Sequence, residues 1–114
     1  MSLLSFLFKG SKLPDTIKIL DLDDYSKAIS KGKVQLVDVR TRGEFMSGHI
    51  KGAKNIDFFQ RSSFETAFSK MDKSKPLYLY CQSGNRSQKA ARRLVEMGFS
   101  EVYDLRGGYR IWNY

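Results

Sequence analysis

One short run of the chain combines a nucleophile with groups that bind anions. Cys81 follows an apolar strand-like segment, 77–80, and precedes a polar turn with Gly84 and Arg86 and then a helix-like segment, 87–97. In α/β proteins, ligands bind at the carboxyl ends of parallel strands, and a helix N-terminus offers free N–H groups to an anion. Gly84 allows the positive φ that lets successive N–H groups converge, and Arg86 adds a fixed cation. The run therefore predicts an anion-binding loop that favours the thiolate of Cys81, the form that attacks.

The other residues of the turn support the same prediction. Gln82, Ser83, Asn85 and Ser87 are expected to form the loop and contribute backbone N–H groups, not to react themselves. The competing interpretation of Cys81 is a small buried hydrophobe, but an apolar role does not require glycine, asparagine, arginine and serine to follow it. A solvated arginine at a helix start is also disfavoured, because a cation is unfavourable there unless it faces an anion.

The rest of the chain alternates strand-like and helix-like segments, a pattern typical of βα units around a parallel sheet. The clearest helix is 87–97, where Ala90, Ala91, Leu94 and Val95 form an apolar face. Strands are expected at 17–20, 34–39, 53–56, 77–80 and 102–105, and helices at 21–30, 63–71 and 87–97, before a short closing segment with Ile111 and Trp112. These elements predict an α/β domain with five strands.

Composition narrows the class of protein further. Of 114 residues, Cys81 is the only cysteine and His49 the only histidine, so an internal disulfide cannot form and the ligands of a structural zinc site are missing. The longest apolar run, 3–8, is far below the roughly 20 residues that span a bilayer, and it lacks the pattern of a signal peptide. We therefore expect a cytoplasmic protein with no transmembrane segment, no metal and no cofactor.

The formal net charge of +8 favours anionic partners without choosing among them. The basic residues are spread along the chain, and their default interpretation is a solvated surface. Nothing resembles an RNA-reading motif, so nucleic acid is not the expected partner.

Three motifs, in order, resemble the single-domain rhodanese family. Cys81-Gln82-Ser83-Gly84-Asn85-Arg86-Ser87 is similar to its active-site loop, C-x-x-G-x-R-S. Asp38-Val39-Arg40 with Glu44-Phe45 and the segment 48–56 resembles D-V-R…E-[YF]-x-x-G-H-I-x-G-A-x-N-[IL], with Lys51 where many members have proline. The segment 105–112 resembles the closing L-x-G-G-x-x-x-W. The resemblance runs from about residue 17 to 114, and such ordered motifs are specific.

The resemblance implies a three-layer rhodanese-like domain, a five-stranded parallel sheet flanked by helices on both faces. It also implies a sulfurtransferase in which Cys81 takes the outer sulfur of a donor such as thiosulfate as a persulfide, and an external thiol or protein acceptor removes it. Arg86, Gln82, Ser83, Gly84, Asn85 and Ser87 would then bind the small anionic donor. The domain would span 15–114, preceded by an N-terminal arm, 1–14, that the resemblance does not cover.

Three alternatives remain beside the sulfurtransferase. Cysteine phosphatases, some of them rhodanese-like, place five residues between nucleophile and arginine, whereas four separate Cys81 from Arg86. They also commonly have histidine where this chain has Tyr80. A thiol hydrolase would pair Cys81 with His49, but no third orienting group is identifiable, and His49 is better interpreted as a structural hydrogen-bonder. A non-catalytic rhodanese-like binding or regulatory module is the alternative of a different class, although such a module would not need Cys81 and Arg86.

A few further residues near the motifs are expected to be structural. Asp38 is expected to tie down a loop through backbone N–H groups, and Arg40 and Glu44 to pair with each other or with nearby backbone. Trp112 is expected to close the core beside the sheet, and Tyr78 and Tyr80 to face the core or lie half-buried.

Overall fold

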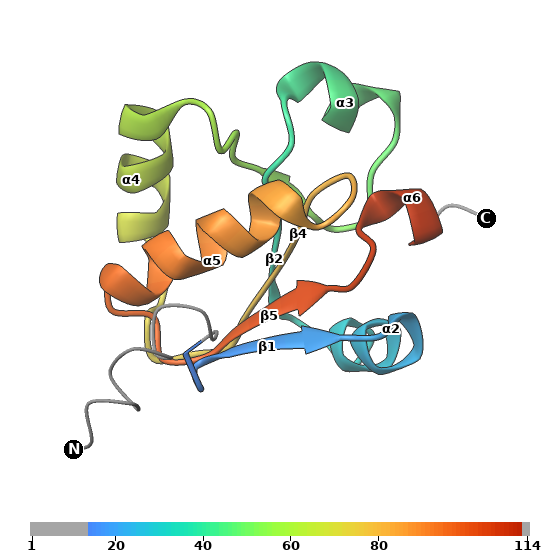
Figure 1. The fold of residues 1–114 in the computed structure, drawn as a ribbon, viewed down its shortest axis with the longest axis horizontal. Helices are drawn as coiled ribbons and strands as arrows, with labels where there is room; N and C mark the ends of the chain where they lie inside the picture. The colour runs from blue at the N-terminus through green and yellow to red at the C-terminus, as the bar shows by residue number, and fades with distance from the viewer. Residues whose placement is uncertain (1–13, 113–114) are drawn as a thin grey trace, which may run out of the picture.

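The computed structural model describes residues 14–112, which form a parallel β-sheet with helices on both faces (Figure 1). The strand order is β1-β5-β4-β2-β3, and every neighbouring pair is parallel. The strands are β1 (Ile17–Leu20), β2 (Gln35–Asp38), β3 (Lys54–Asn55), β4 (Leu77–Tyr80) and β5 (Val102–Leu105); the helices are α2 (Leu22–Ile29), α3 (Arg42–Ser47), α4 (Arg61–Ser69), α5 (Asn85–Glu96) and α6 (Tyr109–Trp112). The predicted fold class is confirmed, and β4, which leads to Cys81, is the central strand.

Alternation along the strands divides the core into two layers, because successive side chains point to opposite faces of a sheet. Leu77, Leu79 and Cys81 pack with the buried side chains of α4 and α5, including Phe64 and Leu94. Burying an aliphatic or aromatic side chain of this size contributes about 1.5 to 3 kcal/mol, so this layer is a main source of stability.

The opposite face of the sheet is covered by α2 and α6. Tyr80 and Leu105 are buried there with Tyr25 of α2, and Tyr78 and Trp112 pack against them. The Tyr25 and Trp112 rings meet edge to face with their centroids 6.4 Å apart. The expected places of Trp112, Tyr78 and Tyr80 are therefore confirmed.

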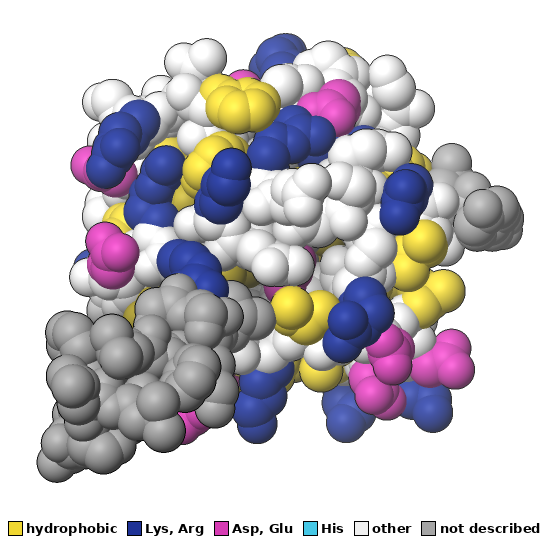
Figure 2. Space-filling model, in the orientation of Figure 1, with side chains coloured by type: hydrophobic (Ala, Val, Ile, Leu, Met, Phe, Trp, Pro, Cys, Tyr) yellow, Lys and Arg dark blue, Asp and Glu magenta, His cyan; other side chains and the backbone are white. Residues whose placement is uncertain are grey.

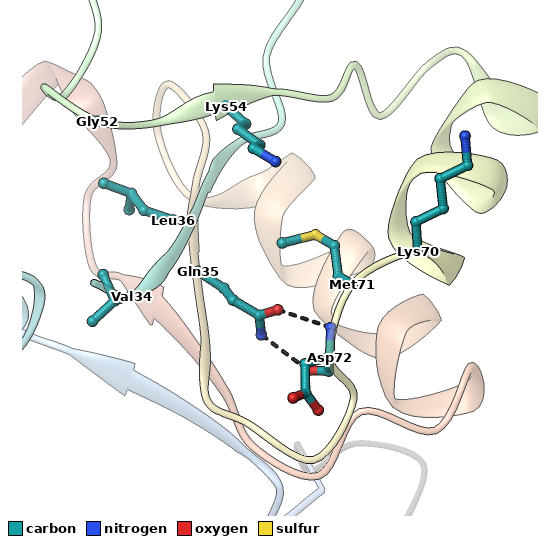
Figure 3. A pocket seen from close by; sticks show the side chains of 8 residues that line it. All are labelled: Val34, Gln35, Leu36, Gly52, Lys54, Lys70, Met71 and Asp72. Carbon is teal, nitrogen blue, oxygen red and sulfur yellow. Dashed lines mark hydrogen bonds between the residues drawn. The ribbon is translucent and has the colours of Figure 1, made fainter.

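One glutamine, at the amino end of β2, joins this strand to the connection between α4 and β4. Gln35 Nε2 donates to the carbonyl oxygen of Asp72 at 3.0 Å, and Gln35 Oε1 accepts from the Asp72 N–H at 2.9 Å (Figure 3). Lys54 and Lys70 flank the same hollow, which has a volume of about 270 Å³. This hollow lies at the end of the strands away from Cys81, so it is not part of the site described below.

Helix α3, between β2 and β3, was not predicted by the sequence analysis. It has six residues and none of them is buried, so it carries no apolar stripe that periodicity could detect. A capping box starts it: the Thr41 hydroxyl accepts from the Glu44 N–H, and the Glu44 carboxylate accepts from the Thr41 N–H. The local signal was thus Thr41-x-x-Glu44.

The remaining boundaries differ from expectation by a few residues. Strand β3 has two residues instead of four, α4 begins at Arg61 and ends at Ser69, and α5 begins at Asn85. Gly98 follows α5 with φ +104°, the left-handed conformation expected of a residue that ends a helix. The expected N-terminal arm, 1–14, lies outside the described residues except for Pro14.

Candidate functional site

Cys81 lies at the carboxyl end of the central strand, directly before the turn into α5. Its side chain is 1% exposed. The Gly84 N–H donates to Cys81 Sγ at 3.0 Å, and Sγ lies 3.3 Å from the hydroxyl of Ser87 in the first turn of α5. Gly84 has φ +113°, which a residue with a side chain adopts only under strain. The structure therefore brings Cys81, Gly84 and Ser87 together: the Gly84 N–H donates to the sulfur, and the Ser87 hydroxyl accepts from the thiol while it donates to the Gly84 carbonyl oxygen.

Arg86 is held by an acidic residue that the sequence analysis assigned elsewhere. Its two terminal nitrogens, Nη1 and Nη2, donate to Glu44 Oε1 and Oε2 at 2.7 and 2.9 Å. The hydrogen bonds from Arg86, with those from Thr41, lower the pKa of Glu44 to about 2 despite partial burial. Helix α3 thus positions a carboxylate over the start of α5, and the cation that we expected to face a ligand is paired already.

Arg40 has different partners from those expected. Its guanidinium forms a buried ion pair with Asp38, with Nη2 and Oδ2 2.7 Å apart, and Nη1 donates to Gln82 Oε1 at 3.0 Å. Nη2 also donates to the carbonyl oxygen of Gly48. Arg40 and Glu44 do not pair with each other; both contact nearby backbone, the second of the two expected alternatives. Asp38 accepts from the Arg40 N–H at 2.9 Å, as expected of a residue that ties down a loop.

The segment after β5 closes the back of the turn. The N–H groups of Tyr109 and Arg110 donate to the carbonyl oxygens of Cys81 and Gln82 at 2.8 and 3.2 Å. Gly108 has φ +70°, and a Cβ there would lie 2.6 Å from the carbonyl oxygens of both Cys81 and Gln82. The two backbone segments approach so closely that only glycine fits between them.

Three other candidate residues lie at the edge of the site. Ser83 and Asn85 are exposed, consistent with a part in forming the turn. His49 is exposed too; its ring stacks on Phe45 with centroids 3.7 Å apart, and Nδ1 hydrogen-bonds to the Phe45 carbonyl oxygen at 2.9 Å. His49 is therefore held against Phe45 of α3, and within residues 14–112 no hydrogen bond joins it to Cys81.

A shallow hollow of about 340 Å³ opens beside the turn and is lined by Arg40, Glu44, Ser47, Gly48, Gln82 and Tyr109. The surface around α4 and α5 carries scattered Lys and Arg side chains with acidic ones between them, not a single basic stripe (Figure 2). Within residues 14–112, no three His, Cys, Asp or Glu side chains are placed to hold a metal ion. Over the same residues, every helix is too short or too polar to cross a membrane.

One acidic residue near the turn was missed by the sequence analysis. Asp104 of β5 is fully buried, and neither of its carboxyl oxygens has a hydrogen-bond partner. Burial raises the pKa of Asp104 to about 7, against smaller lowering effects of the Ser87 hydroxyl and the Leu105 N–H. The available signal was an aspartate inside the otherwise apolar strand Val102-Tyr103-Asp104-Leu105.

Comparisons with known proteins agree with this geometry. The family model of the rhodanese-like domain matches residues 21–114. Thiosulfate sulfurtransferase GlpE of Pseudomonas aeruginosa (strain LESB58) is 36% identical over 89 residues, 78% of each chain. An uncharacterized protein, YqhL of Bacillus subtilis (strain 168), is 44% identical over 80 residues, 70% of this chain but only 61% of YqhL.

Solved structures show the same architecture. A rhodanese-like domain protein from Staphylococcus aureus has a TM-score of 0.73 at 29% identity, covering 84% of this chain and 91% of that one. The human single-domain sulfurtransferase TSTD1 has a TM-score of 0.70 at 27% identity, covering 82% of this chain and 93% of that one. A sheet with this strand order, a cysteine turn at its carboxyl edge and matches over most of the chain lead to one conclusion: the chain belongs to the rhodanese-like domain family.

Proposed function

We propose that this protein is a sulfurtransferase that carries a sulfane sulfur as a persulfide on Cys81. The observation that carries the proposal is the N–H of Gly84 directed at Sγ from 3.0 Å, with the Ser87 hydroxyl 3.3 Å from the same atom. The backbone N–H of Gly84, fixed in this way, stabilises an anionic sulfur without reorganising when it forms, and the Ser87 hydroxyl can rotate to donate to it. The similarity to thiosulfate sulfurtransferases supports a donor such as thiosulfate.

In the proposed cycle the Cys81 thiolate attacks the outer sulfur of thiosulfate. A sulfur–sulfur bond forms at Cys81 while the sulfur–sulfur bond of thiosulfate breaks, and sulfite leaves with the bonding electron pair. A thiophile such as cyanide then attacks the outer sulfur of the persulfide, and Cys81 leaves as thiolate. Because the sequence contains one cysteine, no resolving thiol exists in this chain, and the acceptor comes from another molecule.

Arg86 has a narrower role in this proposal than a free cation would have. Its pairing with Glu44 cancels much of its long-range attraction for an anionic donor, while three of its five N–H donors remain available to the sulfonate group. Gln82, Ser83 and Asn85 belong to the proposed donor site through the shape of the turn. The proposed domain spans 15–114, with residues 1–14 as an arm.

Steady-state kinetics test the proposal. Thiocyanate formation with thiosulfate varied at several fixed cyanide concentrations should give parallel double-reciprocal lines, because both half-reactions share one covalent intermediate. Cys81→Ser should lose turnover, and Ser30→Ala, an exposed residue at the end of α2 and outside the site, should keep it. Intersecting lines, or turnover in folded Cys81→Ser, would contradict the mechanism. If the wild-type protein hydrolyses p-nitrophenyl phosphate and transfers no sulfur, the phosphatase is favoured. If it has neither activity, the non-catalytic binding module is favoured.

A further inference from the structure

The central sheet places a second titratable side chain on the same face as Cys81. Asp104 is in register with Leu79 of β4, and Cys81 follows Leu79 by two residues, so all three side chains point toward α5. Val102, two residues before Asp104, packs in the same layer. Ser87, from the first turn of α5, completes this cluster and is itself fully buried.

Asp104 has an unusual environment for an aspartate. Of the five ion pairs within residues 14–112, none includes Asp104, and both of its carboxyl oxygens lack a hydrogen-bond partner. An ionised carboxylate buried without a partner costs several kcal/mol, so this position favours a carboxyl group that holds a proton. A protonated carboxyl group in turn needs an acceptor for that proton.

The Ser87 hydroxyl is placed to connect the two groups. Its oxygen lies 3.3 Å from Cys81 Sγ and donates to the Gly84 carbonyl oxygen at 3.1 Å, and the helix that carries Ser87, α5, packs against β5, the strand of Asp104. A hydroxyl group accepts and donates at once, and its hydrogen can rotate. Turned from Gly84 toward Asp104, the hydroxyl would accept from the Cys81 thiol and donate to the carboxylate.

We propose that Cys81 and Asp104 share one proton through Ser87, so that Asp104 is a positioning residue that takes the thiol proton when the thiolate forms. The S–H proton moves to Ser87 Oγ while the Ser87 hydroxyl proton moves to a carboxylate oxygen of Asp104. One S–H and one O–H bond break, two O–H bonds form, and the electron pair of the S–H bond stays on sulfur. The protonated Asp104 then donates to Ser87, whose hydroxyl donates to the thiolate. The inference deepens the proposed function, on which it rests for the use of that thiolate.

The other ionisable groups around Asp104 do not supply this proton. Tyr25 of α2 approaches from the opposite face of the sheet, but its hydroxyl donates to the Leu79 carbonyl oxygen at 3.0 Å. On α5, Arg86 pairs with Glu44, and Arg93 lies over the Phe58 and Phe64 rings, 4.5 and 4.8 Å from their centroids. Cys81, through Ser87, remains as the proton source.

The order in which the two groups ionise tests the proposal without any sulfur donor. Carbon-13 NMR of the Asp104 carboxyl carbon, assigned with Asp104→Asn, reports its protonation, and the rate of iodoacetamide alkylation reports the Cys81 thiolate. In wild type we expect the thiolate to appear while Asp104 is still protonated. In Cys81→Ser, which cannot form the second anion, the Asp104 midpoint should fall by at least about one pH unit, a tenfold change in proton affinity.

Control variants separate the relay from a general change in the loop. Ser83→Ala should have the same pH midpoint for Asp104 ionisation as the wild type. In Ser87→Ala, the Asp104 midpoint should move toward the value found in Cys81→Ser. If Cys81→Ser does not fold, Cys81→Ala provides the same comparison. A thiolate that appears only after Asp104 has ionised, or equal Asp104 midpoints in wild type and the Cys81 variants, would overturn the proposal. Because no turnover is measured, either result is independent of whether the protein transfers sulfur.

Discussion

Replacing Gly108 with alanine tests whether the segment after β5 positions Cys81. The new Cβ would lie 2.6 Å from the Cys81 and Gln82 carbonyl oxygens, whereas ordinary contacts begin at 3.4 Å, so backbone has to move by about 0.8 Å. Such overpacking costs about 1 to 3 kcal/mol, and the left-handed backbone at φ +70° adds about 1 to 2 kcal/mol for any residue but glycine. Gly108→Ala should therefore lower the free energy of unfolding by about 2 to 5 kcal/mol.

Gly52→Ala provides a matched control. Gly52 also has a positive φ, +90°, but nothing lies within 4 Å of a Cβ built there. This variant should show the backbone strain alone, about 1 to 2 kcal/mol, and should keep the activity of the wild type. The difference between the two variants isolates the contact with the Cys81 turn.

Urea denaturation gives the free energies of unfolding, and thiocyanate formation under conditions where each variant is folded gives the activity. A displacement near 1 Å at a reacting group can reduce a rate by about 100-fold, so Gly108→Ala should lose at least tenfold. If Gly108→Ala is no less stable than Gly52→Ala and transfers sulfur at the wild-type rate, the close approach does not position Cys81, and the reasoning is refuted.

Three further predictions concern the charged residues around the turn. Glu44→Gln can keep the capping box but removes the charge that neutralises Arg86, so the KM for thiosulfate should fall about two- to fivefold, and high salt should remove the effect. The pKa of Glu44 is about 2 in the folded protein, below its unfolded value, so the stabilisation by the Glu44 carboxylate is present above about pH 4.5 and is lost as the pH falls toward 2. In urea denaturation at pH 7, the free energy of unfolding of Glu44→Gln should therefore be about 1 to 2 kcal/mol below that of the wild type, and this difference should shrink as the pH falls over that range. Arg40→Ala leaves the buried Asp38 carboxylate without its partner and should cost about 3 to 5 kcal/mol in the same assay, and an effect below 1 kcal/mol would show that this pair does not stabilise the turn.

Much of the fold could be predicted from the sequence because hydrophobic periodicity and chain punctuation are local. The apolar segments before Asp38, Cys81 and Arg106 became β2, β4 and β5, and Ala90 and Leu94 mark the buried face of α5. Helix α3 escaped because a six-residue helix without a buried residue is specified by its cap and by tertiary contacts.

In the candidate site, contacts between residues close together in the sequence could be predicted, whereas contacts between residues far apart in the sequence could not. Gly84 and Ser87 follow Cys81 closely, so their contacts with Sγ could be expected from the motif. The pairing of Arg86 with Glu44 joins residues 42 positions apart, whereas the sequence analysis considered only Arg40 and nearby backbone as partners of Glu44. Asp104 reaches the site only because β5 pairs with β4, a relation fixed by strand order and invisible in a single segment.

Intact mass spectrometry tests the central claim most directly. Wild-type protein incubated with thiosulfate should gain the mass of one sulfur atom, about 32 Da, and lose it on addition of cyanide, because the persulfide on Cys81 is reversible. Cys81→Ser should gain nothing under the same conditions. A folded wild type that takes up no sulfur from thiosulfate or from a persulfide donor, or a Cys81→Ser variant that takes up as much as wild type, would contradict a persulfide on Cys81.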